Sequence, residues 1–439
     1  MIGLRKELLK SSNWILGIQW LFFIFTNIVV IPITVGAAFE LPPEKTVMLL
    51  QLSFIVTGIA CIAQGLFGHR RAIVEGQSGL WWGVILSLAY MAPAQGIPLG
   101  ELGGSLAVGV IITGILSVVI GLTGMGSIVA KLFNANVMGV FMFLLGLQLV
   151  SNFLKGMLGI PFGSQSDSAQ IDLSVTMLSV VIVFLVMLLN IRAPFEVKKY
   201  SLLIGIVVGW ILYTLLFKQE QSIGTISSFS VELFPLGRPS WNIGVIVTTV
   251  IAGLLNTANT FGALKGTDTM YQSATTDASY RSSFTITGIT NMISGIFGLV
   301  PYAPYVSSIG FLGQMGVLRR LPFILGSFMF IMMGMIPAIG RFFSMLPLSV
   351  GSAVLFVAYL QLFLSSWNFF NEMTFNSYTV YRAALPLFVG IVIMTMPASY
   401  FDSIPTVIRP LVSNGMLVGI ILALIMERIF PWDRYSVAS

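Results

Sequence analysis

Charge is the scarcest property of this sequence. Of its 439 residues only 9% are Asp, Glu, Lys or Arg, against about 25% in an average soluble domain, while 56% are hydrophobic. A single water-soluble core cannot absorb so much apolar surface. The one cysteine, Cys61, excludes internal disulfides and thiolate metal clusters. The sequence also lacks a phosphate-binding loop, a metal-ligand cluster and an activated nucleophile, which argues against a pump or a hydrolase and predicts no cofactor and no metal.

What the sequence has instead is a series of long apolar runs separated by short polar connectors. Runs of about 20 residues are long enough to cross the hydrocarbon core as helices. They predict an all-α integral membrane protein with fourteen elements, of which the third, tenth and thirteenth are too short to cross as complete helices. The elements lie near residues 14–37, 46–68, 78–92, 102–123, 134–154, 174–190, 200–217, 242–264, 283–300, 306–317, 321–343, 347–365, 384–397 and 408–430.

The distribution of basic residues predicts how these elements are oriented. With the N-terminus inside, sixteen of the 22 lysine and arginine residues fall in inner connectors and the other six in outer ones. Cytoplasmic connectors of membrane proteins are enriched in Lys and Arg, so both termini are expected in the cytoplasm. The net charge of +6 then reflects topology and not a nucleic-acid-binding surface. The longest polar connector, Lys218 to Pro239, falls on the outer side and divides the chain almost at its centre.

Stretches of the first half recur in the second half at two offsets, 230 and 213 residues. Both matches pair elements that are seven apart, so the second copy enters the membrane in the opposite sense. One match between apolar, Gly-rich helices could arise by chance, but two that agree predict a 7+7 inverted repeat of residues 1–220 and 238–439. The repeated stretches are Thr57-Gly58-Ile59 with Thr287-Gly288-Ile289, Gly65 with Gly295, Phe67-Gly68 with Phe297-Gly298, and Asn136 to Val150 with Ser349 to Phe363.

The third and tenth elements are the best candidates for a binding site. Both are short, are interrupted by Gly and Ser, and occupy equivalent places in the two halves, as discontinuous helices of transporters do. Interrupted backbone inside a membrane must be buried or line a cavity, and a helix that starts there directs free N–H groups at a ligand. Packing between small residues of neighbouring helices is the alternative. The candidate substrate-binding residues are Gln77, Ser78, Gly79, Val306, Ser307 and Ser308.

A second polar group lies in the eighth element. Asn256, Asn259 and Thr260 are spaced three and four residues apart, which places them on one face of a helix. Asn256 and Asn259 could each offer a donor and an acceptor to a planar polar ligand, although a hydrogen bond between helices explains them nearly as well. Gln148 and Gln361, which share one position of the repeat, are interpreted as helix contacts.

Membrane-embedded carboxylates usually mark proton or ion coupling. The sixteen acidic residues of this chain lie almost entirely in connectors, and only Glu75 and Glu101 fall near the candidate site. His69, next to Arg70 and Arg71, is interpreted as an interfacial residue and not as a proton relay. Coupling is therefore the part of the mechanism on which the sequence says least.

Several of these stretches resemble one known family, the uracil/xanthine permeases or nucleobase–cation symporters. The resemblance runs along most of the chain. It implies short β-strands in elements 3 and 10 with the substrate between them, a core domain of about 14–123 and 242–343, and a gate domain of about 134–217 and 347–430. It also implies a coupling proton or sodium ion and a homodimer. The similar stretches are Gln19, Gly76-Gln77-Ser78, Gly295 to Gly310 and Pro347 to Gly351.

The sequence departs from this family at ionisable positions. Asn259 and Ala263 stand where the family usually has a glutamate and, in some members, a histidine. Ser307 stands at the tenth-element glutamate of the uracil carriers, and Trp20 at the histidine that commonly follows Gln19. An amide at position 259 can hydrogen-bond the edge of a nucleobase, but it cannot ionise. The resemblance thus implies a divergent member without the usual site glutamates.

These observations predict a secondary active transporter of the cell membrane, not an enzyme, that moves a purine or pyrimidine base by alternating access. Two alternatives stay open: an anion carrier of the same fold, similar to the sulfate/bicarbonate family, and a membrane sensor that binds a base without moving it. Half-helix dipoles and the missing glutamates favour the anion carrier, whereas a sensor usually has a soluble output domain. The site hypothesis predicts that Asn259→Ala and Ser307→Ala weaken base binding more than Gln148→Ala does.

Overall fold

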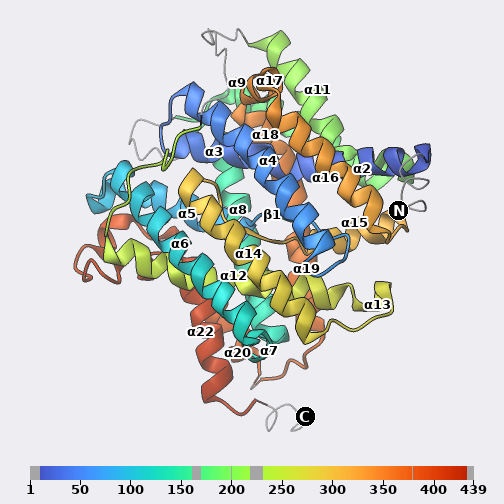
Figure 1. Cartoon of the computed structure of the whole chain (residues 1–439). Coiled ribbons are helices and arrows are strands. Elements are labelled where there is room, and N and C mark those ends of the chain that lie inside the picture. Colours follow the sequence, from blue (N-terminus) through green and yellow to red (C-terminus); the bar gives the residue numbers. More distant parts are fainter. Residues whose placement is uncertain (1–9, 161–169, 199, 218–230, 378, 433–439) are drawn as a thin grey trace.

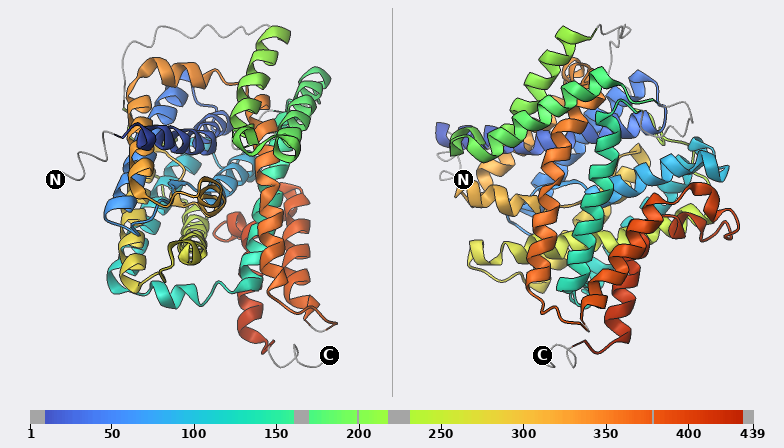
Figure 2. Two further views of the ribbon diagram at one scale, coloured as in Figure 1. Left: turned by 90° about the vertical axis from the view of Figure 1, so that its right-hand side faces the viewer. Right: turned by 180° about the vertical axis from the view of Figure 1, so that it is seen from behind.

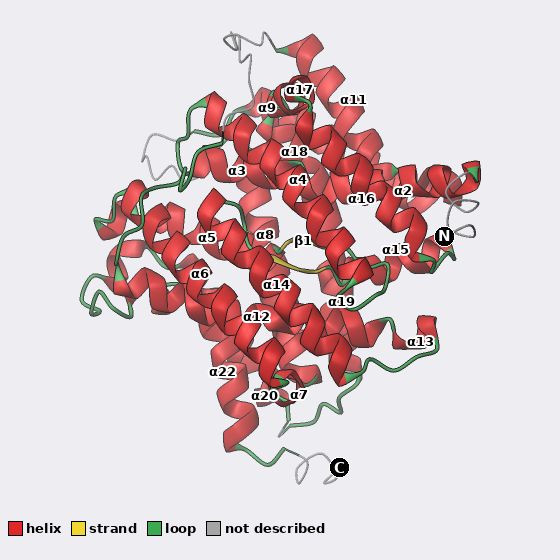
Figure 3. Ribbon diagram, viewed as in Figure 1, coloured by secondary structure: helices red, strands yellow, loops and turns green. Residues whose placement is uncertain are grey.

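A computed structural model describes residues 10–160, 170–198, 200–217, 231–377 and 379–432. These residues form helices apart from one pair of short strands near the centre of the molecule (Figure 1, Figure 3). Seven helices of the described chain are long and apolar enough to cross a membrane, or eight if one bent pair is a single span. Most of the predicted central connector, residues 218–230, lies outside the described residues, as do both chain ends.

The helices of the first half lie over the predicted elements. The first predicted element, 14–37, is divided into two helices at Val29. Asparagine and aspartate fix two helix starts, because the Asn134 side chain accepts a hydrogen bond from Val137 N at 3.1 Å and Asp172 accepts one from Ser174 N at 2.9 Å. The first-half elements are α2 (Ser11–Ile28), α3 (Val30–Ala38), α4 (Pro43–Leu66), β1 (Glu75–Gln77), α5 (Gly79–Met91), η1 (Pro93–Gln95), α6 (Leu99–Thr123), α7 (Gly126–Ala130), α8 (Ala135–Met157), α9 (Leu173–Arg192), α10 (Phe195–Lys198) and α11 (Ser201–Leu216).

In the second half, the predicted elements 321–343, 347–365 and 408–430 are each divided into two helices. Residues 321–343 were expected as one span, but two helices meet there at an angle of 85°. The break falls at Ile336 and Pro337, because proline has no N–H to donate and favours the first turn of a new helix. The second-half elements are α12 (Ile243–Gly266), α13 (Asp268–Tyr271), α14 (Asp277–Phe297), β2 (Tyr302–Pro304), α15 (Ser307–Met315), α16 (Arg320–Met335), α17 (Pro337–Ser344), α18 (Leu348–Tyr359), α19 (Gln361–Asn371), α20 (Val380–Thr395), η2 (Ala398–Phe401), α21 (Arg409–Val412) and α22 (Gly415–Ile429).

The long helices pack into two groups that lie side by side in the left view of Figure 2. In the first group, α14 and α12 pack on α6, while α2 and α4 pack on α16. In the second group, α18, α19, α20 and α22 surround α8, and α9 packs on α11 and α18. We name these groups bundle A and bundle B. Each bundle combines helices from both halves of the sequence, so neither half forms a bundle alone.

Repeated glycines allow the closest helix contacts in bundle A. A Cβ added to Gly58 of α4 would lie 2.6 Å from Ser327 O of α16, and one added to Gly288 of α14 would lie 2.6 Å from Gly114 O of α6. Gly58 and Gly288 are the residues matched by the offset of 230. Each of these two matched glycines thus allows a close helix contact, since a small residue lets two helix backbones approach within the membrane.

The contact between α6 and α14 should be sensitive to one methyl group at Gly114. A Cβ there would lie 2.7 Å from Gly288 O and 2.9 Å from Met292 N, both backbone atoms that a rotamer change cannot move. We expect Gly114→Ala to cost about 1–3 kcal/mol, the usual cost of overpacking, and to lower the melting temperature in detergent. Gly100→Ala on the same helix is the control, because a Cβ there meets nothing within 4 Å. Equal melting temperatures for the two variants would contradict the packing described here.

Candidate functional site

The two interrupted elements meet as a pair of antiparallel strands. Glu75 of β1 lies opposite Pro304 of β2, and Gln77 lies opposite Tyr302. All three residues of each strand are buried. The pairing continues past the strand ends, where Ser78 N donates to Pro301 O at 2.8 Å and Tyr305 N donates to Val74 O at 2.8 Å. The strands thus satisfy much of each other's backbone where neither element is helical.

A short helix leaves each strand. α5 begins at Gly79 after β1, α15 begins at Ser307 after β2, and the two helices lie on opposite sides of the strands (Figure 1). Neither N-cap residue, Ser78 or Val306, places a side-chain acceptor on the first turn of its helix. First-turn N–H groups have no partner within their own helix, and they carry the positive end of the helix dipole. The start of α5 therefore offers donors suited to carbonyl or anionic oxygens, whereas at the start of α15 Ser308 N and Ile309 N already donate to Tyr305 O at 3.1 Å and to Val306 O at 3.0 Å.

A chain of hydrogen bonds joins α12 to this centre. Ser78 Oγ donates to Asn256 Oδ1 at 2.6 Å, and Asn259 Nδ2 donates to the same oxygen at 2.9 Å. Asn256 Nδ2 in turn donates to Tyr302 O of β2 at 3.2 Å. Asn256 is buried, whereas Asn259 at the end of the chain is half-buried. Asn256 is therefore occupied with the protein, and Asn259 is the member that a ligand can reach.

The other candidate residues divide into those that face inward and those that do not. Gln77 donates to Ser53 Oγ of α4 at 3.1 Å, and Ser308 Oγ accepts from Val74 N at 3.1 Å, so both side chains hold the strands in place. Gly79 and Val306 are half-buried, and Ser307 is exposed. The structure thus brings Ser78, Asn256 and Asn259 into contact, and it turns Gln77 toward α4 and Ser308 toward the segment before β1.

Bundle B approaches the same region with side chains that the sequence analysis did not single out. A Cβ on Gly79 would lie 3.6 Å from the ring of Tyr359 of α18, and one on Gly262 would lie 3.6 Å from Met138 of α8 and 3.3 Å from Val306. Tyr359 stands inside the segment that repeats at the offset of 213. A tyrosine within that repeated apolar segment was the sequence feature that could have identified Tyr359 as a site residue. Aromatic faces are suitable platforms for planar ligands.

Gln148 of α8 was expected to serve as the control position for the site hypothesis, but it lies close to the candidate site. Its Nε2 donates to Gly83 O of α5 at 2.8 Å, which joins bundle B to the helix that starts beside Ser78. The interpretation of Gln148 as a helix contact agrees with this bond, but α5 also packs on α12 and α6 of bundle A, so the bond connects the two bundles. Gln361, its counterpart in the repeat, is exposed on α19 and is the better control.

The charged residues near the strands are held by other parts of the protein. Glu101 is exposed and accepts from Asn242 Nδ2 at 2.9 Å. His69, expected at an interface, is buried, and its Nδ1 accepts from Arg71 N at 3.1 Å. Arg71 pairs with Asp268 at 2.8 Å and so anchors the segment before β1 to the end of α12. Glu75 alone is a buried acid on the strands themselves. Within the described residues no cluster of three or more His, Cys, Asp or Glu could hold a metal ion.

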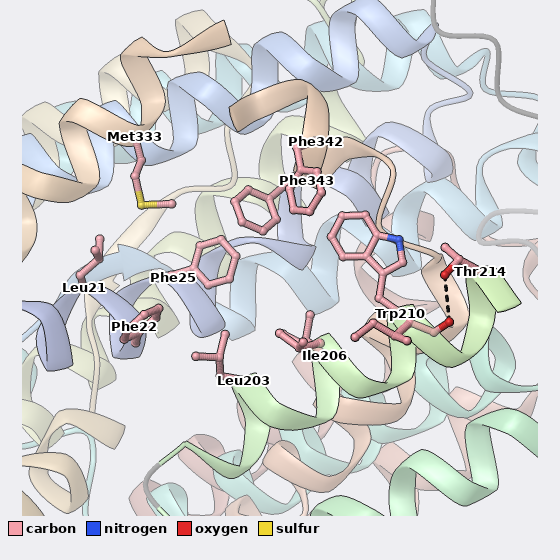
Figure 4. Close-up of a pocket in the computed structure, with 12 residues that line it drawn as sticks. Leu21, Phe22, Phe25, Leu203, Ile206, Trp210, Thr214, Met333, Phe342 and Phe343 are labelled. Carbon is pink, nitrogen blue, oxygen red and sulfur yellow. Dashed lines mark hydrogen bonds between the residues drawn. The ribbon is translucent and has the colours of Figure 1, made fainter. Parts of the chain in front are cut away.

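A cavity of about 560 Å³ lies between the bundles, and none of the candidate site residues lines it (Figure 4). Its single lining hydroxyl, Thr214 Oγ1, donates to Ile211 O of its own helix at 2.9 Å. The indole N–H of Trp210 is the one further polar group of this lining, which is too few to recognise the edge of a planar polar ligand or an anion, so this cavity is not the candidate site. It is lined by Leu21, Phe22, Phe25, Leu203, Ile206, Val207, Trp210, Ile211, Thr214, Met333, Phe342 and Phe343.

The arrangement of bundles and broken elements is similar to the fold of solved membrane proteins. The transmembrane domain of the cyanobacterium bicarbonate transporter BicA superposes with a TM-score of 0.64 over 95% of this chain and 98% of that chain, at 15% identity. SLC26A9 superposes with a TM-score of 0.62 over 95% of this chain and 66% of that chain, at 13% identity. At such identities the likeness concerns the fold alone.

The sequence relatives define the family. The model of the Permease family that covers xanthine and uracil permeases matches residues 11–399. The putative purine permease YwdJ of Bacillus subtilis is 29% identical over 434 residues, 95% of this chain and 96% of that protein. The uric acid permease PucJ of the same organism is 25% identical over 420 residues, 94% and 92% of the two chains. The chain belongs to the xanthine/uracil permease family and is a multi-pass membrane transporter, not an enzyme.

Accessibility of the candidate site can be measured with thiol chemistry. Cys61 is the only cysteine of the sequence and is buried, so an introduced cysteine at the site is the only accessible thiol. We expect a maleimide to label Ser307→Cys in the native protein and to leave Ser308→Cys unlabelled, because Ser307 is exposed and Ser308 is 0% exposed. Both variants should react after denaturation. Equal labelling in the folded state would show that α15 does not present Ser307 to the solvent side.

Proposed function

We propose that this transporter is a secondary active permease that moves a purine or pyrimidine nucleobase across the cell membrane. The observation that carries the proposal is the Ser78–Asn256–Asn259 hydrogen-bonded chain beside two half-helix starts. A nucleobase is flat, apolar on its faces and lined with carbonyl and N–H groups at its edge. The names of the similar proteins, a purine permease and a uric acid permease, support the same class of substrate.

The residues at the centre would divide the recognition of a base among them. The Asn259 amide offers both a donor and an acceptor to the edge of the ring. First-turn N–H groups of α5 would donate to its carbonyl oxygens. The ring of Tyr359 would cover one face of the base from bundle B. Because these groups are neutral, they select for shape and hydrogen-bonding pattern, and not for charge.

Transport would follow from movement of bundle A, as the core domain, against bundle B, as the gate domain. Two contacts hold α8 of bundle B against α5: the bond from Gln148 to Gly83, and Lys155 Nζ above the ring of Tyr90 at 4.1 Å from its centroid. Lys155 and Tyr90 fall on the side that the distribution of basic residues predicts to be external. Opening toward the outside would therefore break these contacts. The proposal includes a 7+7 inverted repeat, cytoplasmic termini, a coupling proton or sodium ion and a homodimer.

An anion carrier is the second candidate. Two structural neighbours are transporters of bicarbonate or other anions, and two helix N-termini directed at one point suit an anion. The neutral amides of α12 count against it, since they add no positive charge to that of the helix dipoles. Direct transport assays separate the two functions.

Uptake into proteoliposomes tests both candidates. We expect saturable transport of labelled xanthine, uric acid or uracil, with labelled sulfate and bicarbonate left outside. Asn259→Ala and Ser307→Ala should weaken base transport, whereas Gln361→Ala should not, because Gln361 is exposed on α19. Loss of one charge-free hydrogen bond to the base corresponds to about 0.5–1.5 kcal/mol, roughly a two- to tenfold rise in the apparent KM. Saturable sulfate transport without base transport would replace the nucleobase proposal by the anion carrier.

A further inference from the structure

Glu75 is a carboxyl group buried at the centre of the membrane-embedded fold without a cation beside it. Its side chain is 0% exposed. Oε1 accepts from Thr287 Oγ1 of α14 at 2.6 Å, and Oε2 accepts from Gln64 Nε2 of α4 at 3.2 Å. Both donors are neutral. A carboxylate removed from water and paired only with neutral groups is strongly disfavoured. Burial therefore costs less free energy when this carboxyl group is protonated.

The titratable groups that face Glu75 do not supply the missing charge. From α4 the Cys61 thiol bonds to the Glu75 backbone, with Sγ 3.4 Å from its O and 3.3 Å from its N. From β2 and the residue after it come two phenols, Tyr302 bonded to Thr57 at 3.0 Å and Tyr305 bonded to Gln77 O at 2.7 Å. α2, which also packs on β1, has no titratable side chain.

Charged groups on the neighbouring helices and on the preceding loop have other partners or lie at helix ends. No described cation lies within ion-pairing distance of the Glu75 oxygens. The groups concerned are Arg71, paired with Asp268 at 2.8 Å; Lys45, paired with Glu232 at 2.9 Å; Arg320, which donates to Gly65 O at 3.2 Å; Arg281, which donates to Leu122 O at 2.8 Å; and His69, Glu44, Lys265, Asp277 and Tyr280.

The surroundings can accommodate both protonation states with little movement. A threonine hydroxyl is both donor and acceptor, and its hydrogen can rotate. Thr287 can therefore donate to the carboxylate and, after rotation, accept from the protonated carboxyl group. Gln64 Oε1 is buried and has no hydrogen-bond partner among the described residues, which leaves a second acceptor on the side chain that already contacts Glu75. A carboxyl group that stayed in one protonation state would not need these additional acceptors.

Glu75 is also linked mechanically to the proposed substrate site. Side chains of a strand alternate between its faces, so Glu75 and Gln77 point toward α4 while Ser78, at the start of α5, bonds to α12. The carboxyl group and the Ser78 hydroxyl thus lie on the two sides of one short segment. Any change in the bonds of Glu75 acts on the strand whose next residues form the substrate-facing end of α5.

We propose that Glu75 is the proton-binding site through which this permease couples base transport to the proton gradient, an inference that rests on the proposed function. The proton binds to a carboxylate oxygen from the external medium and is released from it to the interior, and only this O–H bond forms and breaks. Occupancy of the site keeps the strand pair in the arrangement that admits the base. The chain would thus place its coupling acid on β1 and leave its α12 site neutral at Asn259.

The test separates coupled accumulation from uncoupled exchange in proteoliposomes. In wild-type protein, an inward proton gradient should drive xanthine accumulation and an influx of protons that an internal pH dye records. Glu75→Gln keeps the size of the side chain, and it keeps both contacts if its amide oxygen accepts from Gln64 while its NH2 group donates to the rotated Thr287 hydroxyl. It should therefore retain counterflow of labelled xanthine within about twofold while losing accumulation and proton influx. Glu101→Gln, at an exposed acid, should behave as wild type in both assays. Accumulation by Glu75→Gln equal to wild type, or accumulation driven by sodium at constant pH, would overturn the proposal.

A spectroscopic measurement tests the proton site independently of base transport. Infrared difference spectra of wild-type protein should show a protonated carboxyl band near neutral pH that is missing from Glu75→Gln. Absence of that band from the wild type overturns the proton site even if base transport is found. Presence of the band without any base counterflow contradicts the proposed substrate while supporting the proton site. If Glu75→Gln fails to fold, Glu75→Asp should keep the band at a shifted frequency, and an unshifted band would assign it to another acid.

Discussion

The backbone of the two broken elements must be satisfied without water, and the rest of the centre follows from that constraint. A two-stranded sheet leaves unpaired groups along both edges, which lipid cannot hydrogen-bond. Here side chains cover them. Tyr302 N donates to Asn291 Oδ1 at 2.6 Å and Tyr302 O accepts from Asn256, while the backbone of Glu75 bonds to Cys61. A polar residue on each of α4, α12 and α14 is thus bonded to the strands before any ligand arrives.

This requirement explains which parts of the fold the sequence can predict. Helices need only apolar length, so the ranges read from hydropathy fall on the observed helices. The breaks at Ser78 and Ser307 are visible because Gly and Ser interrupt the apolar runs. The bend at Pro337 was missed, since the residues on both sides of it are equally apolar and a proline within a membrane helix does not always break it. The strands have three residues each, too few for a periodic pattern, and came from the family resemblance.

Side-chain direction at the centre was harder to predict than position. Gln77 and Ser78 are neighbours in sequence and were treated as one group, but they bond to α4 and α12 respectively. Ser307 and Ser308 separate in the same way, one exposed and one buried against Val74. Tyr359 and Gln148 come to the centre from the second bundle, and only the packing of two bundles against each other reveals them. No local pattern encodes such a contact, because it depends on helices far apart in the chain.

The candidate site is neutral at Asn259, and the acidic residue of the strands, Glu75, is buried on their other side. Under the proposed mechanism, aqueous access to the substrate would alternate between the two sides of the membrane, so groups on the access path would meet water and lipid-like surroundings in turn. A carboxylate at position 259 would be exposed to both environments, whereas Glu75 is enclosed by α4, α14 and the strands in the state described here. If the proposed roles hold, placing the ionisable group behind the strands separates recognition of the base from the binding of the proton. The strand pair is then the one element that both functions share, which is why its backbone has to be fixed on every edge.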